Sequence, residues 1–186
     1  MELLLLALAG LVVLAVPVYN GIVNRKNAVQ SAWASVLVQE RQKMKILPAL
    51  EKAVSEYSEF EKGLLTQITQ LREHLNGLEE EAPNTDRLNQ SEALTNEIMK
   101  SVNLTVEAYP DLKSEGLVRN MMQEISEQQE QIGAALRLFN SNVQIFNSYI
   151  QNFPNNLVNS ILNKEPPVRV FTDSKAASNF EYRPNL

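Results

Sequence analysis

Clustered carboxylates are the residues of this 186-residue chain that come closest to a metal-binding or catalytic pattern. Carboxylate-bridged metal sites in helical bundles need Glu-x-x-His pairs, but the single histidine, His74, has Leu71 three residues before it. Beside an apolar helical stripe, glutamates at helical spacing are typical of a solvated flank. We therefore expect no metal and no cofactor at the two clusters, which are Glu56, Glu59 and Glu61, and Glu124, Glu127 and Glu130.

Other motifs that carry chemistry are missing from the sequence. There is no Gly-rich phosphate loop, no Gly-x-Ser-x-Gly turn, and no cysteine to act as a nucleophile or a thiolate ligand. The acidic run at 79–81 lacks the alternating oxygen ligands of a calcium loop. A net charge of -5 with scattered lysines and arginines argues against nucleic-acid binding. We predict no catalytic residues and no enzymatic activity.

Side-chain amides gather in one segment, FNSNVQIFNSYIQNFPNNL at 139–157. Asn140 and Asn147 each follow a phenylalanine, and a glutamine lies four residues after each asparagine. In one interpretation, an amide at the edge of a bundle bonds to a neighbouring helix and fixes its register. In the other, the amides form a polar recognition face for a peptide, a glycan or a protein. The candidate partner-binding residues are Asn140, Gln144, Asn147 and Gln151.

An apolar repeat of seven residues defines the helix that carries these amides. Alternating spacings of four and three place apolar side chains on one helical stripe. The pattern predicts a helix of about forty residues that ends near Phe153, because Pro154 cannot continue it. Gln129 is the one polar position on the stripe. The apolar side chains expected in the core are Val118, Met122, Ile125, Ile132, Leu136, Phe139, Val143, Phe146, Ile150, Phe153 and Leu157.

The preceding sequence predicts two further helices. A first apolar stripe runs from Ile22 to Leu75 and is interrupted by the polar segment 40–45 and by Pro48, where we expect a kink. A loop at 79–86 separates it from a helix that Asp86 caps and that stops before Pro110. After position 162 the helical period is lost, so we expect an extended tail with Phe171 and Phe180 as anchors.

These elements predict an all-α fold, an elongated antiparallel bundle of three to four long helices with an N-terminal transmembrane helix and an irregular C-terminal tail. The expected boundaries are 1–20 for the anchor, 21–162 for the bundle and 163–186 for the tail.

The N-terminal segment LLLLALAGLVVLAVPV, Leu3 to Val18, contains no charged residue and predicts a membrane anchor. A cleaved signal peptide and a buried core helix are the alternatives. The absence of Lys or Arg before the run argues against a signal peptide, and little else in the chain is apolar enough to surround a core helix. Because Arg25 and Lys26 follow the segment, we expect a single-pass protein of the cell membrane with a cytoplasmic bundle.

Three segments resemble the LemA family, in the order expected of that family. They are VYNGIVNRKNAVQSAWASVLVQERQKMKILPAL at 18–50, AYPDLK at 108–113, and the amide-rich segment at 139–157. The resemblance implies a small bacterial membrane protein with one anchor and long antiparallel helices, and it implies no defined biochemical activity. The sequence departs from the family pattern at Leu37 and Lys45, where acidic residues are usual, and at Ala49, where asparagine is usual.

Two functions stay open at this point. The first is a membrane-anchored scaffold or interaction protein that binds other membrane-associated proteins or forms homo-oligomers. The alternative is an accessory protein for membrane remodelling or transport. The anchor contains no charged residue and no Gly-x-x-x-Gly pair, which favours the scaffold.

Overall fold

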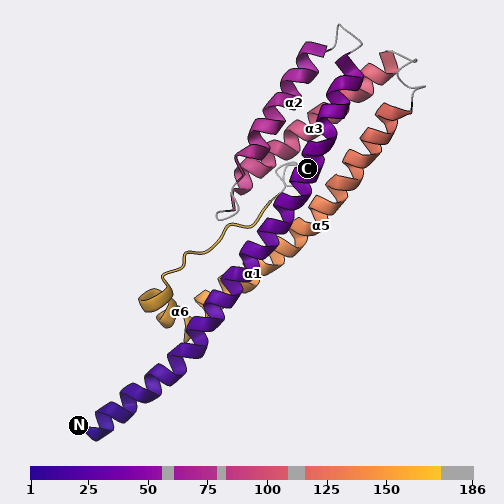
Figure 1. Cartoon of the computed structure of the whole chain (residues 1–186). Coiled ribbons are helices and arrows are strands. Elements are labelled where there is room, and N and C mark those ends of the chain that lie inside the picture. The colour runs from indigo at the N-terminus through magenta and orange to yellow at the C-terminus, as the bar shows by residue number, and fades with distance from the viewer. Residues whose placement is uncertain (56–60, 79–82, 109–115, 173–186) are drawn as a thin grey trace, which may run out of the picture.

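The computed structural model describes residues 1–55, 61–78, 83–108 and 116–172. It is built from helices, and no strand occurs in these ranges (Figure 1). The long helices are α1 (Glu2–Ser55), α2 (Glu61–Asn76), α3 (Thr85–Ala108) and α5 (Leu117–Gln151). They are followed by the short α6 (Asn155–Val158) and a π-helical turn, η1 (Asn159–Asn163). The predicted all-α bundle is confirmed.

The antiparallel pair of α1 and α5 forms the long axis of the molecule (Figure 1). Trp33 of α1 packs against Phe139 of α5 at 5.4 Å between ring centroids, and both side chains are fully buried. The hairpin of α2 and α3 covers the half of this pair that lies away from the N-terminus. One continuous core joins all four long helices.

The apolar stripe of α5 follows the predicted period of seven over most of its length. The buried residues include Val118, Ile125, Ile132, Leu136, Phe139, Val143, Phe146 and Ile150. Met121 is buried in place of Met122, which is only partly covered. The prediction for Phe153 and Leu157 is wrong, since both side chains are exposed. The helix ends at Gln151 and Asn152 is extended, so the helical period stops before Phe153.

The predicted first helix is divided into two. Helix α1 ends at Ser55 and α2 begins at Glu61, with the chain direction reversed between them (Figure 1). The sequence gives no break signal there, because no proline or glycine lies between Ala49 and Lys62. Pro48, where a kink was expected, lies inside the continuous helix α1.

Helix α3 faces the core with small hydroxyl side chains between its apolar residues. Leu88, Ile98 and Val102 are buried, and Ser91, Thr95 and Thr105 are buried with them. Each hydroxyl donates to the carbonyl four residues earlier, which satisfies it without a partner from another helix. The N-terminal cap is Asn84, whose Oδ1 accepts from the Arg87 N–H at 2.9 Å, and not the predicted Asp86.

The N-terminal third of α1 extends beyond the bundle (Figure 1). Its large apolar side chains are exposed, and they include Leu3, Leu5, Leu6, Val12, Val13, Leu14 and Val16. In the part of the chain that the structure describes, no helix has both the length and the apolar character needed to cross a membrane. The predicted transmembrane helix at 1–20 is therefore not supported. As a helix, the run from Leu3 to Val18 is about 24 Å long, less than the roughly 30 Å of a bilayer core.

Candidate functional site

Two of the four predicted amides, Asn140 and Asn147, hold an extended segment of the same chain. We name this segment, residues 164–172, the strap. The Asn140 Nδ2 donates to the Phe171 carbonyl at 2.8 Å, and its Oδ1 accepts from the Phe171 N–H at 2.8 Å. Asn147 makes the same pair of bonds with Val168, at 2.8 Å and 2.9 Å. Each carboxamide thus uses its donor and its acceptor on a single residue of the strap.

The spacing of the two asparagines matches the spacing of the strap residues. Seven residues of an α-helix cover about 10 Å, and three residues of an extended chain cover about 9 Å. Asn140 and Asn147 can therefore bind every third residue of a chain that runs antiparallel to α5. Pro166 and Pro167 favour this extended conformation, since each proline fixes φ.

A third asparagine, Asn159, repeats the pattern at the start of the strap. Its Nδ2 donates to the Glu165 carbonyl at 3.0 Å and its Oδ1 accepts from the Glu165 N–H at 3.1 Å. The Glu165 carboxylate also pairs with Lys26 Nζ at 2.6 Å, which ties the strap to α1. We name Asn140, Asn147 and Asn159 the amide row. The sequence interpretation missed Asn159, because it lies outside the repeat of seven.

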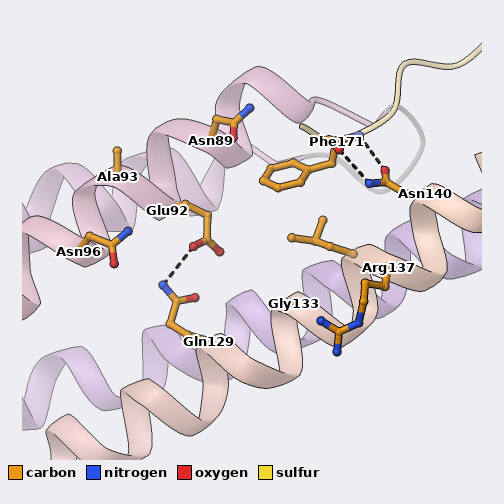
Figure 2. Close-up of a pocket in the computed structure, with 10 residues that line it drawn as sticks. Asn89, Glu92, Ala93, Asn96, Gln129, Gly133, Arg137, Asn140 and Phe171 are labelled. Carbon is orange, nitrogen blue, oxygen red and sulfur yellow. Dashed lines mark hydrogen bonds between the residues drawn. The ribbon is translucent and has the colours of Figure 1, made fainter. Parts of the chain in front are cut away.

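A groove of about 370 Å³ lies between α3 and α5 beside the end of the strap (Figure 2). Phe171 lines one end, and the Gln129 Nε2 donates to Glu92 Oε2 at 3.1 Å further along. Most of the other lining side chains are polar, among them Asn89, Asn96, Arg137 and Asn140. This lining can hydrogen-bond a ligand, and it contains no cysteine, serine or histidine; its carboxylate, Glu92, accepts from Gln129.

The other predicted site residues do not reach the strap through any hydrogen bond of the described structure. Gln144 is exposed and lines a shallow depression beside Arg25 and Tyr149, and Gln151 is exposed at the end of α5. Partner binding by the four amides stays a prediction.

Of the carboxylates, Glu124, Glu127 and Glu130 are exposed, whereas Glu56 and Glu59 lie outside the described residues. In the described ranges, no group of three His, Asp or Glu residues is placed to bind a metal ion.

Similarity to known proteins extends over most of the chain. Residues 32–181, which include α5, the amide row and the strap, match the LemA family. The chain belongs to the LemA family. The resemblance to the LemA family is thereby confirmed. The Protein LemA of Metamycoplasma hominis is 29% identical over 139 residues, which are 75% of this chain and 62% of that protein. The chain thus spans less than two thirds of that relative's length.

Leu37 and Lys45, where the resemblance led us to expect acidic residues, differ in how far they are buried. Leu37 is buried in the core between the long helices, so an acidic side chain there would need a partner. Lys45 is exposed on α1. The two positions at which the resemblance implied acidic residues are thus one core residue and one surface residue.

A buried ion pair lies within the core of this LemA-family bundle. Glu40 and Lys43 of α1 occupy the polar interruption noted in the sequence, and their side chains are 1% and 0% exposed. Lys43 Nζ lies 2.8 Å from Glu40 Oε2. Lys43 Nζ and both carboxylate oxygens of Glu40 make no hydrogen bond in the described structure. Such a pair contributes little net stability, because desolvating two charges offsets their attraction.

Proposed function

We propose that this LemA-family chain is an interaction protein, without enzymatic activity, that is held at the cytoplasmic face of a lipid bilayer by a single short N-terminal anchor, residues 2–20. Its bundle then binds copies of itself. The observation that carries the proposal is the apolar part of α1, which extends from the bundle with its large side chains exposed. Exposed apolar area of this extent is unfavourable in water and is favourable in the acyl region of a membrane.

The end of the bundle next to this helix is also apolar. Phe153, Leu157, Ile161 and Leu162 of α6, η1 and the preceding turn are exposed, and Phe153 is 80% exposed. These short elements contact α1 near the point where its N-terminal part leaves the bundle (Figure 1). Arg25 and Lys26 lie on the first turns of α1 inside the bundle, where Arg25 stacks on the Tyr149 ring and Lys26 pairs with Glu165. Both side chains are half-buried, so they place positive charge at the level expected for lipid phosphates. This end of the molecule therefore suits a membrane surface.

The proposal of self-association is supported by the outer face of α5. Leu138 and Ile145 are seven residues apart on this helix, and they are 63% and 53% exposed. Residues at this spacing lie on one side of a helix, as in the contact stripe between two helices. Attachment to a common membrane raises the effective concentration of copies, so contacts of modest area suffice.

Flotation with lipid vesicles tests the attachment. The full chain is mixed with vesicles of phosphatidylethanolamine and phosphatidylglycerol and centrifuged through a density gradient. We expect it to float with the lipid, and we expect Val13→Asp/Leu14→Asp to stay at the bottom. The matched control is Val38→Asp, since Val38 is an exposed apolar residue of α1 within the bundle. Wild type that stays at the bottom, or equal flotation of the double variant, would contradict the proposal.

A further inference from the structure

We propose that Asn140 and Asn147 form a binding site for an extended polypeptide backbone, and that the strap of a second copy of this chain occupies it in exchange for the chain's own strap. The proposal rests on the proposed association of copies at a membrane. It names the segment that passes between them, residues 165–171, and the two side chains that receive it.

The amides bind the strap through its backbone. All four hydrogen bonds of Asn140 and Asn147 go to the N–H and carbonyl groups of Val168 and Phe171, and none uses a strap side chain. The strap of a second copy presents the same groups at the same spacing. Exchange of an identical segment between copies therefore conserves these four hydrogen bonds, and exchange of this kind is a low-cost route to assembly.

The strap is held by few apolar contacts. Val168 and Phe171 are only partly buried, and Pro166, Pro167, Arg169, Val170 and Thr172 are exposed. The ion pair of Arg169 Nη1 with Asp86 Oδ2, at 3.0 Å, lies at the surface and adds little. When the strap leaves, the half-buried amides of Asn140 and Asn147 lose their partners. That loss favours binding of another backbone in the same place.

The hinge for this exchange is Lys164. Its φ of 54° and ψ of 32° place it in the left-handed region, which is unfavourable for a residue with a Cβ atom. Straightening of the chain at Lys164 relieves this conformation, and strained hinges promote exchange of segments between copies. The helices and η1 can keep their positions while the strap moves, but Glu165 must then give up its two hydrogen bonds with Asn159 and its ion pair with Lys26.

The reach of the strap suits neighbours on one membrane. Residues 168–171 lie along the acceptor, so the stretch from Lys164 to Val168 bridges the copies. Its four residue steps cover about 13 Å, a little more than the distance between packed helices, so the two copies must pack directly against each other. The strap follows directly after η1, at the end of the bundle where the N-terminal part of α1 emerges (Figure 1). Copies that are attached side by side through this helix therefore hold strap and site at the same height.

Thiol crosslinking between two full-length variants tests the exchange. The chain has no cysteine, so each variant carries one thiol. The acceptor is Asp86→Cys and the donor is Arg169→Cys, at two surface positions that the exposed ion pair brings together. They are mixed in vesicles and treated with a short bismaleimide. We expect a crosslinked heterodimer of acceptor and donor. Its yield should be about tenfold higher than when Gln123→Cys replaces the acceptor, since Gln123 is exposed near the start of α5, away from the amides.

Substitution of the amides gives the decisive asymmetry. Asn140→Leu/Asn147→Leu in the acceptor should lower the heterodimer yield by about tenfold or more, since four hydrogen bonds are lost. The same pair in the donor should not lower it, because the released strap still finds an intact acceptor. Far-ultraviolet circular dichroism of the substituted chain checks separately that it folds. Equal yields with Gln123→Cys, or no loss in the acceptor arm, would overturn the exchange.

Crosslinking through lysines then separates the two proposals. If copies crosslink through lysines but give no product between Asp86→Cys and Arg169→Cys, the copies associate without exchanging the strap. If neither product forms, both self-association and exchange are refuted.

Discussion

The buried pair of Glu40 and Lys43 permits a quantitative test of how the bundle is stabilised. The change is Lys43→Met, which keeps most of the length of the side chain but removes its charge. The Glu40 carboxylate, 1% exposed, then lies in the core without a cation. Removal of one member of a buried ion pair costs about 3–5 kcal/mol, because the remaining charge stays desolvated and unpaired.

The double variant Glu40→Leu/Lys43→Met is the matched comparison. It removes both charges and fills the site with apolar side chains of similar size. Replacement of a whole buried pair in this way is neutral or stabilising by about 1–4 kcal/mol. We therefore expect the second substitution to recover all of the stability that the first one loses.

Urea unfolding of the full chain in mild detergent, followed by far-ultraviolet circular dichroism, measures these changes. The free energy of unfolding should fall for the single variant and return to the wild-type value or above it for the double variant. A single variant as stable as wild type would refute the burial of the pair. A double variant no better than the single one would show that the charges contribute net stability.

Three further predictions concern the core, a close contact and the orientation. Phe146→Ala should lower the free energy of unfolding by about 3–5 kcal/mol, and the exposed control Ser148→Ala on the same helix by less than about 0.5 kcal/mol; equal losses would contradict the apolar stripe. Gly21→Ala should cost about 1–3 kcal/mol in the same assay, because its Cβ would lie 2.9 Å from Tyr149 Cζ; an unchanged midpoint would show that the ring moves freely. Thr172→Cys should resist an impermeant maleimide in intact cells if the bundle is cytoplasmic, whereas rapid labelling would place it outside.

The helical class and the stripe of α5 could be predicted because both are local properties. A period of seven residues places Phe139, Val143 and Phe146 on one side of a helix whatever that helix packs against. The end of α5 was predictable for the same reason, since Pro154 acts on its own neighbours. The reversal between α1 and α2 was not, because the apolar stripe continues up to it and contains no turn residue.

The binding of the strap could be predicted only in part. The sequence shows the two amides and an extended segment with a phenylalanine, and Phe171 does pack against the core as expected. An extended segment has no period that shows which surface it lies on. The bonds of Asn140 to Phe171 join residues 31 positions apart, so they depend on the turn formed by α6 and η1. The burial of Glu40 likewise depends on helices distant in sequence.

Single-molecule photobleaching tests the central claim, that membrane-held copies associate, most directly. The full chain carrying Gln123→Cys is labelled with one fluorophore, reconstituted into vesicles at fewer than one chain per vesicle, and transferred to a supported bilayer at low density. We predict diffusing spots that bleach in more than one step, with the multistep fraction rising as surface density rises. Spots that bleach in a single step at every density would contradict association of the copies.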